Sequence, residues 1–492
     1  LTITDPSGDT SRIPVRGGYN VPVAGAPSSE IVALPATDRL YLPLRSRRFD
    51  FTDVLVEEGQ RVSAGEAVAV DPAHYDVPLL APRGGTVRLA EAEGHVVLEG
   101  LEPASEGAPA APAGAGSGVS TRKLLELGAW QFFSDARTRE PVDPAVAPSA
   151  IIVSTLRLEP FLAGGEAQLG GQRLERLTRG LSHLRSLAPD APLYVAVPDV
   201  DQPLAADVRA AAAQCQDAHI VSVPMRFPFD DSALLARCLK LPSGYDVTVW
   251  ALTAEGVLAI DAALSEGRPA NERIVSVAGP AVDGAVHVSV VVGHPIENIL
   301  DGRVRGEWAR VVSGGLLTGE ALPAGQLGLD TECTGLTVLG EPDTQTLIAF
   351  ARPGVADRSY SRTFVGTLRT DLAVSYRAGL SGEVRPCISC GLCADVCPAG
   401  ILPAPIHKHL YAGNYEEAQR LRVDLCVGCG LCSFVCPSKI DLRSELLRAV
   451  DVLREEAALV RAEAEAAAAE AAAAEAEKAA AEPEGAGALE SP

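Results

Sequence analysis

The sequence predicts a multidomain protein that combines α/β and β architectures. The chain has 492 residues, which is more than one hydrophobic core usually organises, and ~150 residues per domain suggests about three or four domains. Residues 121–265 alternate continuous apolar runs with helical stretches, whereas the regions on either side contain short strands and turns. Two four-cysteine runs of identical spacing follow towards the C-terminus and indicate a further, separate module.

Composition and charge exclude several classes of protein. The formal net charge is −22, and residues 451–492 hold 11 acidic side chains against 3 basic ones. Nucleic acid is therefore not an expected partner, because its binding depends on cationic contacts to phosphate. No run of about 18 apolar residues could span a membrane, and residues 1–14 lack the apolar core of an export signal. We expect a reducing cytoplasmic compartment, which favours thiolate ligands over disulfides.

Residues 12–102 are predicted to form a barrel-sandwich domain. Val54-Leu-Val-Glu-Glu-Gly59, Val62-Ser-Ala-Gly65 and Ala81-Pro-Arg-Gly-Gly-Thr-Val87 alternate apolar positions with glycine and proline turns. This pattern resembles the lipoyl and biotinyl carriers, whose swinging arm is attached to a lysine at a hairpin tip. The first lysine of this chain is Lys123. The sequence therefore predicts the carrier scaffold without the carrier chemistry.

Residues 103–120 are rich in Pro, Ala, Gly and Ser and are predicted to be a linker. Residues 121–265 are predicted to form a Rossmann-like parallel α/β domain, because apolar runs without alternation are typical of strands buried on both faces. The runs are Ile151–Thr155, Leu193–Val197, Ile220–Val223 and Val247–Trp250, and the predicted helices are Gln172–Leu187, Ala205–Gln214 and Thr253–Ser265. Such a fold does not by itself establish a nucleotide site.

The remaining segments give three further predictions. Residues 266–345 return to strand patterns, at Arg273–Gly279, Val286–Val290 and Arg310–Gly315, and favour a small β-grasp module of the SLBB type. Residues 375–440 contain the cysteine runs. Residues 441–492 form an Ala/Glu-rich tail. Its stretch Leu442–Ala481 has no Gly or Pro, which predicts a helix of about 60 Å that ends before Pro483. Its amphipathic start is expected to pack on the cysteine module or a neighbouring subunit, and its remainder to be solvated.

The cysteine runs carry the most specific signal in the sequence. Cys387-Ile-Ser-Cys390-Gly-Leu-Cys393-Ala-Asp-Val-Cys397-Pro398 has the spacing C-x2-C-x2-C-x3-C-P, and the run from Cys426 to Pro437 repeats it. In this pattern three thiolates from one loop and the fourth from the other loop bind each 4Fe–4S cluster. We expect Cys387, Cys390, Cys393 and Cys436 to hold one cluster, and Cys426, Cys429, Cys432 and Cys397 to hold the second.

Two other interpretations of the cysteines fit less well. Structural zinc also uses C-x2-C pairs, but two identical runs with a trailing proline are not typical of zinc sites. Disulfides do not suit a cytoplasmic protein. Cys215, Cys238 and Cys333 are scattered and are predicted to be ordinary buried thiols. The 28 residues between the runs look partly helical, which predicts an α-helical double-cluster module in which His407 and His409 occupy exposed helix positions.

Two known families share parts of this sequence. The stretch from Cys387 to Leu410, together with that from Cys426 to Leu447, resembles the ferredoxin module of the C subunit of the Rnf complex, an ion-pumping ferredoxin:NAD oxidoreductase of prokaryotic membranes. The rest is similar to the A subunit of the sodium-pumping NADH:quinone reductase (Nqr), a homologue without iron–sulfur clusters. The matching segments are Gly17–Pro27, Ala81–Val87, Leu124–Trp130, Val275–Pro280 and Val312–Gly319.

One segment departs from the Rnf pattern. The Rnf subunit binds FMN and NADH beside a glycine-rich loop, where this chain has Ala129-Trp-Gln-Phe-Phe-Ser-Asp-Ala-Arg-Thr-Arg-Glu-Pro141. A loop without glycine cannot present a run of backbone amides to a phosphate. Trp130, Phe132 and Phe133 are expected to fill the space instead. We therefore expect FMN and NAD to be absent from this chain, and Arg137 and Arg139 to be surface arginines.

These resemblances imply an electron-transfer subunit of a membrane-associated, ion-translocating complex of the Rnf or Nqr kind. Its two clusters would relay single electrons, without independent NADH dehydrogenase activity. The implied partners are integral-membrane and flavin- or iron–sulfur-bearing subunits, and a soluble ferredoxin or an NADH-oxidising subunit. The implied location is peripheral, on the cytoplasmic side of the prokaryotic inner membrane. Two alternatives stay open, an NADH-oxidising flavoprotein with a degenerate FMN/NADH site and an assembly scaffold.

Overall fold

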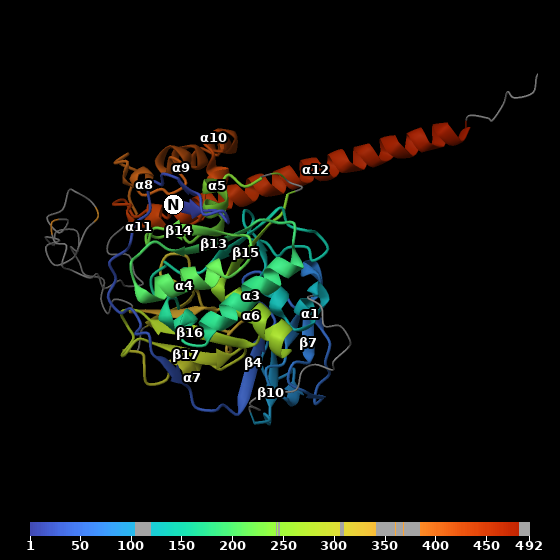
Figure 1. The fold of residues 1–492 in the computed structure, drawn as a ribbon, viewed down its shortest axis with the longest axis vertical. Helices are drawn as coiled ribbons and strands as arrows, with labels where there is room; N and C mark the ends of the chain where they lie inside the picture. Colours follow the sequence, from blue (N-terminus) through green and yellow to red (C-terminus); the bar gives the residue numbers. More distant parts are fainter. Residues whose placement is uncertain are drawn as a thin grey trace, which may run out of the picture.

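The computed structural model describes residues 1–103, 120–242, 244, 247–305, 309–340, 360, 368 and 384–481. Most of the predicted linker, the first residues of the predicted cysteine module (375–383) and the end of the tail lie outside these ranges. The described residues form a mixed α/β structure with several sheets, and the cysteine module lies at one end of the body (Figure 1).

A seven-stranded sheet lies at the centre of the predicted α/β region. Its order is β11-β15-β12-β13-β14-β1-β2. Strands β12 (Ala150–Ser154), β13 (Leu193–Pro198), β14 (Ala218–Val223) and β15 (Val249–Thr253) are mutually parallel, as their uninterrupted apolar runs predict. The sheet is completed by antiparallel strands that the sequence patterns did not indicate: β1 (Thr2–Thr4), β2 (Thr10–Arg12) and β11 (Ser134–Asp135).

The two faces of this sheet are covered differently. Helices α3 (Arg173–Leu187), α4 (Pro203–Ala213) and α6 (Ala254–Asp261) pack on one face. The opposite face packs on α5 (Ser232–Cys238) and on Val427 of the second cysteine run. Successive strand residues point to opposite faces, so Ile151 belongs to the first core and Ile152 to the second. The central sheet therefore supports the cysteine module directly.

Two smaller sheets form the region predicted as a barrel sandwich. One has the order β4-β10-β9-β6 and the other β5-β7-β8. Their bounds are β4 Arg39–Pro43, β5 Asp53–Val54, β6 Arg61–Val62, β7 Ala67–Asp71, β8 Val77–Leu80, β9 Gly85–Arg88 and β10 His95–Glu99, and a short 3₁₀ turn, η1 (Pro72–His74), lies between β7 and β8. These strands begin at Arg39, so the N-terminal part of the predicted range 12–102 belongs elsewhere.

That N-terminal part joins a six-stranded sheet of order β19-β18-β20-β16-β17-β3. Strand β3 (Ile31–Ala33) pairs in parallel with β17 (Val286–Val291), so a segment assigned to the first domain extends the sheet of the third. The other strands of this sheet are β16 (Glu272–Ala278), β18 (Ala309–Ser313), β19 (Glu320–Ala321) and β20 (Gly335–Gly340).

Short helices also lie between strands along the chain, outside the cysteine module. They are α1 (Thr121–Glu126), η2 (Ala129–Phe132), α2 (Glu166–Leu169), η3 (Ala262–Glu266) and α7 (Ile296–Leu300).

The cysteine module is helical over its described residues, as predicted. It contains α8 (Leu392–Asp395), α9 (Pro403–Tyr411), α10 (Tyr415–Arg420), η6 (Val423–Leu425) and α11 (Leu431–Phe434). Helix α12 spans Leu442–Ala481, the range that the sequence predicts, and its first turns bury Leu446, Ala449 and Val450 in the core of the module. The rest of α12 projects away from the body (Figure 1). None of the described helices is both long and apolar enough to cross a bilayer.

Candidate metal centre

The two cysteine runs adopt the same local structure. In each run a glycine in the left-handed region, Gly391 (φ +80°) or Gly430 (φ +76°), starts a single helical turn that carries the third cysteine. A β-carbon at Gly391 would meet no atom within 4 Å, so glycine is needed there for its backbone angle and not for space. The repeated C-x2-C-G-x-C sequence thus gives two equivalent loops.

The loops exchange their fourth cysteines. Cys387, Cys390 and Cys393 line one pocket together with Cys436 from the other run. Cys426, Cys429 and Cys432 line a second pocket together with Cys397 from the first run. We call these sets the outer cysteine group and the inner cysteine group. They coincide with the two ligand sets expected from the sequence, and their binding of clusters stays a prediction.

The remaining walls of both pockets are mostly apolar, except for Ser438 in the outer pocket and Arg443 in the inner one. Ala404, Ile440 and Leu442 line the outer pocket, whereas Ile401, Leu431 and Leu446 line the inner one. The two pockets enclose the same small volume, about 20 Å³ each. Among the described residues, no three His, Cys, Asp or Glu side chains converge tightly enough to hold one metal ion.

Burial determines the electrostatics of the inner group. Burial, followed by the charges of neighbouring cysteines, raises the pKa of Cys429 to about 12 and the pKa of Cys432 well above its usual value. Several thiolates cannot remain ionised together in an apolar pocket unless a cation compensates them. The amide of Gly428 also donates to Cys426 Sγ at 3.4 Å, a contact that stabilises a ligating sulfur. The residues present therefore fit an iron–sulfur cluster.

The inner group is covered by the body of the protein. Gly18 N donates to Val396 O at 2.8 Å, and the ring of Tyr19 stacks on Phe434 with centroids 6.1 Å apart. A β-carbon on Gly17 would lie 2.3 Å from Cys397 O, so only glycine allows the backbone to pass this close. The segment Gly17–Val23 therefore lies along the loops that hold the inner group.

Arginines join the same loops to three other elements. Arg139 Nη2 donates to Val427 O at 2.7 Å and to Asp231 Oδ2 at 2.5 Å. Arg237 donates to Pro398 O at 3.3 Å, and Arg443 bridges Gly428 O and Thr318 O at 2.8 and 3.1 Å. Arg139 lies at the surface, as expected, with 42% of its side chain exposed, but it also binds a loop 288 residues away. No local sequence pattern marks such a contact.

The outer group is more open. The side chain of Cys390 is exposed, and Ile388 in the same loop is 67% exposed. The sequence predicts an exposed position for His407, but its side chain is half-buried. Its Nδ1 lies 2.5 Å from Glu445 Oε2 on α12. His409 is half-buried as well. Both histidines thus take part in packing the module.

The other three cysteines lie outside the module. Cys215 and Cys333 are buried, as predicted, and burial raises the pKa of Cys333 to about 12. Cys238 is half-buried at the end of α5. These positions give no reason to include them in a metal site.

A separate cavity of about 300 Å³ opens at the carboxyl ends of β12 and β15. Ser154 and Thr253 end these two neighbouring strands, and the chain order reverses between them, where α/β sheets commonly bind ligands. Its arginines are already compensated. Arg48 is paired with Glu332, Arg157 with Glu255 at 3.5 Å, and the buried Arg273 donates to Thr331 O at 2.7 Å.

The glycine-free segment lies beside this cavity. Trp130 and Phe133 do not enter it but stack at 4.2 Å in the core, where Trp130 Nε1 donates to Val142 O. Only Phe132 of the three aromatic residues lines the cavity. Burial raises the pKa of Asp230, also in the lining, to about 6. A cavity with this many carboxylates and no uncompensated arginine is a poor site for a phosphate.

Comparison with known proteins identifies one domain and one group of relatives. Residues 386–440 match the 4Fe-4S dicluster domain. The A subunit of the Na(+)-translocating NADH-quinone reductase of Pseudomonas aeruginosa (strain UCBPP-PA14) is 26% identical over 376 residues, covering 74% of this chain and 82% of the relative. The corresponding protein of Shewanella frigidimarina (strain NCIMB 400) is 27% identical over 382 residues, with the same coverage.

A solved structure, the crystal structure of NAD+-reducing [NiFe]-hydrogenase in the air-oxidized state, aligns with a TM-score of 0.37 and 15% identity, over 68% of this chain and 66% of that chain. The sequence comparisons support homology to the A subunit of the Na(+)-translocating reductase, combined with a 4Fe–4S dicluster domain. The resemblance to the C subunit of Rnf stays a prediction.

Proposed function

We propose that this chain is an electron-transfer subunit of a membrane-associated redox complex, and that it relays single electrons through two 4Fe–4S clusters. The observation that carries the proposal is the exchange of cysteines between two equivalent loops, which creates two four-cysteine pockets. The match to a dicluster domain fits a count of two. Each cluster, when bound, takes up and releases one electron at a time.

The residues of the chain have three tasks in this function. Two sets of cysteines hold the clusters, the apolar residues of the pockets restrict water, and backbone amides such as Gly428 N donate to the sulfurs. These factors set the reduction potential of a cluster. The inner and outer pockets belong to one small helical module with a shared core, so electrons can pass between them without a moving domain.

The wider assembly follows from the relatives. The homologues are named as subunits of a Na(+)-translocating reductase, so we propose that this chain also binds other subunits of an Nqr-like or Rnf-like translocase. These would be integral-membrane and flavin- or iron–sulfur-bearing subunits, which would hold the chain at the cytoplasmic face of the membrane. We expect the chain to lack FMN and NAD, and the pairing of the arginines that line the cavity beside β12 and β15 supports this expectation.

The test is the effect of removing one ligand. The anaerobically purified chain should contain about eight iron atoms and show reducible clusters by electron paramagnetic resonance. Cys390→Ser should abolish electron flow from a reductant to an acceptor while the N-terminal domains stay folded. Cys238→Ser, which changes a half-buried thiol outside the module, is the control and should leave electron flow unchanged. Normal turnover by Cys390→Ser, or an iron-free wild-type protein, would refute the proposal.

A second candidate function is direct oxidation of NADH through a flavin. The observation in its favour is the cavity at the ends of β12 and β15, because Asp231 in its lining is joined through Arg139 to the inner cysteine loop at Val427. Extraction of flavin from the purified protein, together with an NADH–dye reductase assay, distinguishes the two functions. We expect no flavin and no activity with NADH while the clusters are intact.

A further inference from the structure

Exposed apolar side chains lie in or just before the loop that carries the outer cysteine group. Ile388 lines the pocket and is 67% exposed, and Val384, just before the first cysteine, is 59% exposed. Cys390 itself is exposed. None of the four cysteines of the inner group is fully exposed, and Gly17–Val23 and the central sheet pack along the loops that carry them. A partner that exchanges electrons at short range therefore has access to the outer group.

Three basic residues surround this opening. Lys408 Nζ donates to Ser389 Oγ at 2.8 Å, and Ser389 belongs to the loop of the outer group. Arg385 N donates to Ser438 O at 2.9 Å, and Ser438 lines the pocket. Lys439 follows directly, and its backbone N donates to Cys436 O at 3.1 Å. The side chain of Lys408 and the backbones of Arg385 and Lys439 are thus bonded to the loops that carry the outer cysteines.

Acidic residues near the opening are few or engaged. No Asp or Glu lines the outer pocket within the part of the chain that the structure describes. Glu445 on α12 is bound to His407, and Asp441 accepts from Ser444 Oγ at 2.6 Å. The exposed Asp395 lies on α8, after the third cysteine of the loop. Among the described residues, positive charge therefore dominates the rim of the outer pocket.

This local charge contrasts with the rest of the protein. The chain carries a net charge of −22 and contains only five lysines, of which Lys408 and Lys439 are two. A negatively charged partner is repelled by the chain as a whole and attracted at this site, so it would be oriented towards the outer group before contact.

We propose that Arg385, Lys408 and Lys439, with Ile388 and Val384, form the docking surface for an acidic one-electron carrier protein, which exchanges electrons with the chain at the outer cysteine group. This inference rests on the proposed electron-transfer function. One electron leaves the reduced carrier and is accepted at the group held by Cys387, Cys390, Cys393 and Cys436; no covalent bond forms or breaks, and no proton is transferred. The electron then passes from the outer group to the inner group.

An acidic protein fits this surface better than an anionic membrane does. The tail that leaves the same module holds 11 acidic residues against 3 basic ones in 451–492, and negatively charged lipid would repel it. The basic rim is also small and centred on the opening of the outer pocket, whereas membrane-binding clusters commonly contain four to eight basic residues.

The test uses a reduced, acidic plant-type [2Fe–2S] ferredoxin as the probe and the cluster-loaded full chain. Its rate of oxidation by the chain is measured by stopped flow at low and high ionic strength. The double variant Arg385→Glu/Lys408→Glu should slow the reaction about tenfold at low salt, and the difference should shrink at high salt. Sodium dithionite, a small reductant, should reduce wild-type and variant chains at rates within about twofold of each other.

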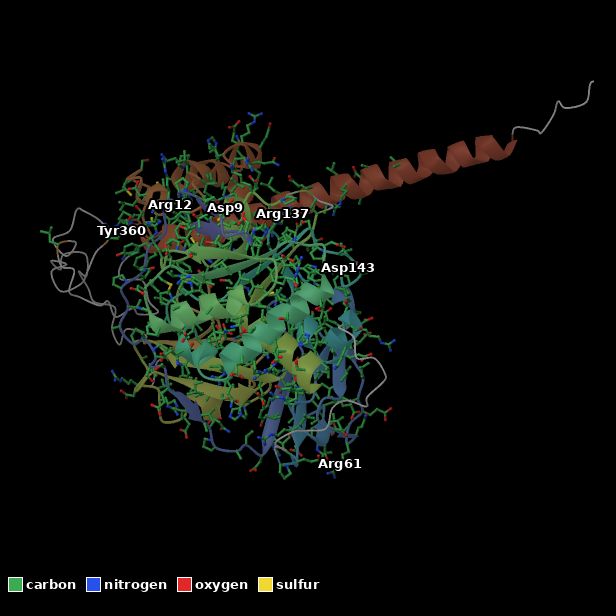
Figure 2. The ribbon with its side chains drawn as sticks, in the orientation of Figure 1. Asp9, Arg12, Arg61, Arg137, Asp143 and Tyr360 are labelled. Atoms are coloured by element: carbon green, nitrogen blue, oxygen red, sulfur yellow. The ribbon has the colours of Figure 1, made fainter. Side chains whose placement is uncertain are left out.

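A matched charge reversal separates local from global effects. Arg61→Glu changes a side chain that is 73% exposed and lies at the end of the molecule opposite the cysteine module (Figure 2). It should leave the ferredoxin rate unchanged within about twofold. A double variant as fast as wild type, or an Arg61→Glu variant equally slowed, would overturn the docking surface. So would wild-type binding to vesicles of anionic phospholipid that the double variant loses. If dithionite reduces no cluster in the wild-type chain, the proposed function itself fails.

Discussion

The outer and inner cysteine groups are built from the same sequence pattern but lie in different surroundings. Both take three cysteines from a C-x2-C-G-x-C loop and one from the other loop. The outer group opens to solvent beside Ile388 and basic side chains, whereas the inner group is held against the central sheet by Gly17–Val23 and Arg139. The repeated sequence specifies the cysteine ligands, and the rest of the chain determines how exposed each cysteine group is.

The largest expected difference concerns the loss of each group. Replacing Cys387 and Cys390 by serine, or Cys429 and Cys432 by serine, should in each case lower the iron content by about half. Only loss of the inner group should loosen the body of the protein, because Val427 and Cys429 pack with Phe229 and Leu234. Hydrogen exchange of Phe227–Cys238 should rise in the inner variant alone. Equal hydrogen exchange in both variants would show that the inner group does not stabilise the body of the protein more than the outer group does.

The close contact of the Gly17 backbone with Cys397 O gives a second test of how the inner group is held. Gly17→Ala should destabilise the chain by about 3–4 kcal/mol, of which about 1–2 kcal/mol reflects its φ of +66° and the remainder the clash with Cys397 O. Gly400→Ala is the matched control. Gly400 has φ +70° but no atom within 4 Å of its β-carbon position, so only the backbone cost should remain. Thermal unfolding measures both variants, and equal losses would contradict the contact.

Arg139 should contribute less than Gly17 to the stability of the folded chain. Arg139→Ala removes the bonds to Val427 O and Asp231 Oδ2, and we expect a loss of about 1–2 kcal/mol in the free energy of unfolding. Arg137→Ala is the control, because Arg137 is exposed and its bond to Gly244 O, at 3.5 Å, is long. Denaturant unfolding of the two variants distinguishes a docking arginine from a surface one. A loss no larger for Arg139 than for Arg137 would rule out the docking role.

The smallest effect concerns pH at the cavity beside the inner group. Burial raises the pKa of Asp230 from 3.8 to about 6, so the folded state holds a proton that the unfolded state releases. The free energy of unfolding should therefore fall as pH rises, by about 1 kcal/mol more in wild type than in Asp230→Asn between pH 5 and pH 7. Parallel stability curves for the two proteins would show that Asp230 ionises normally.

Local patterns allowed much of this structure to be predicted. Continuous apolar runs identify β12, β13, β14 and β15, because such runs are buried on both faces of a parallel sheet. The bounds of α12 follow from an Ala/Glu-rich stretch that Pro483 ends. The crossed cysteine groups follow from spacing, since the fourth cysteine of each run lies beyond the single helical turn that carries the third.

Long-range contacts could not be predicted in the same way. Strands β1 and β3 are three residues long, and nothing in Thr2–Thr4 or Ile31–Ala33 indicates which sheet each will join. The bond from Arg139 to Val427 O links residues 288 positions apart and depends on the folded arrangement. Only the pair Gly17-Gly18 offered a signal, because adjacent glycines often mark a close backbone approach.

Selective loss of a cluster signal tests the exchanged fourth ligands most directly. Cys436→Ser and Cys397→Ser are compared by paramagnetic resonance of the reduced, anaerobically purified chain. The account predicts that Cys436→Ser alters the same signal as Cys390→Ser, from the opposite run, and that Cys397→Ser alters the signal affected by Cys429→Ser. If each fourth cysteine instead follows its own run, or if neither signal exists, the two pockets do not hold clusters in the way described.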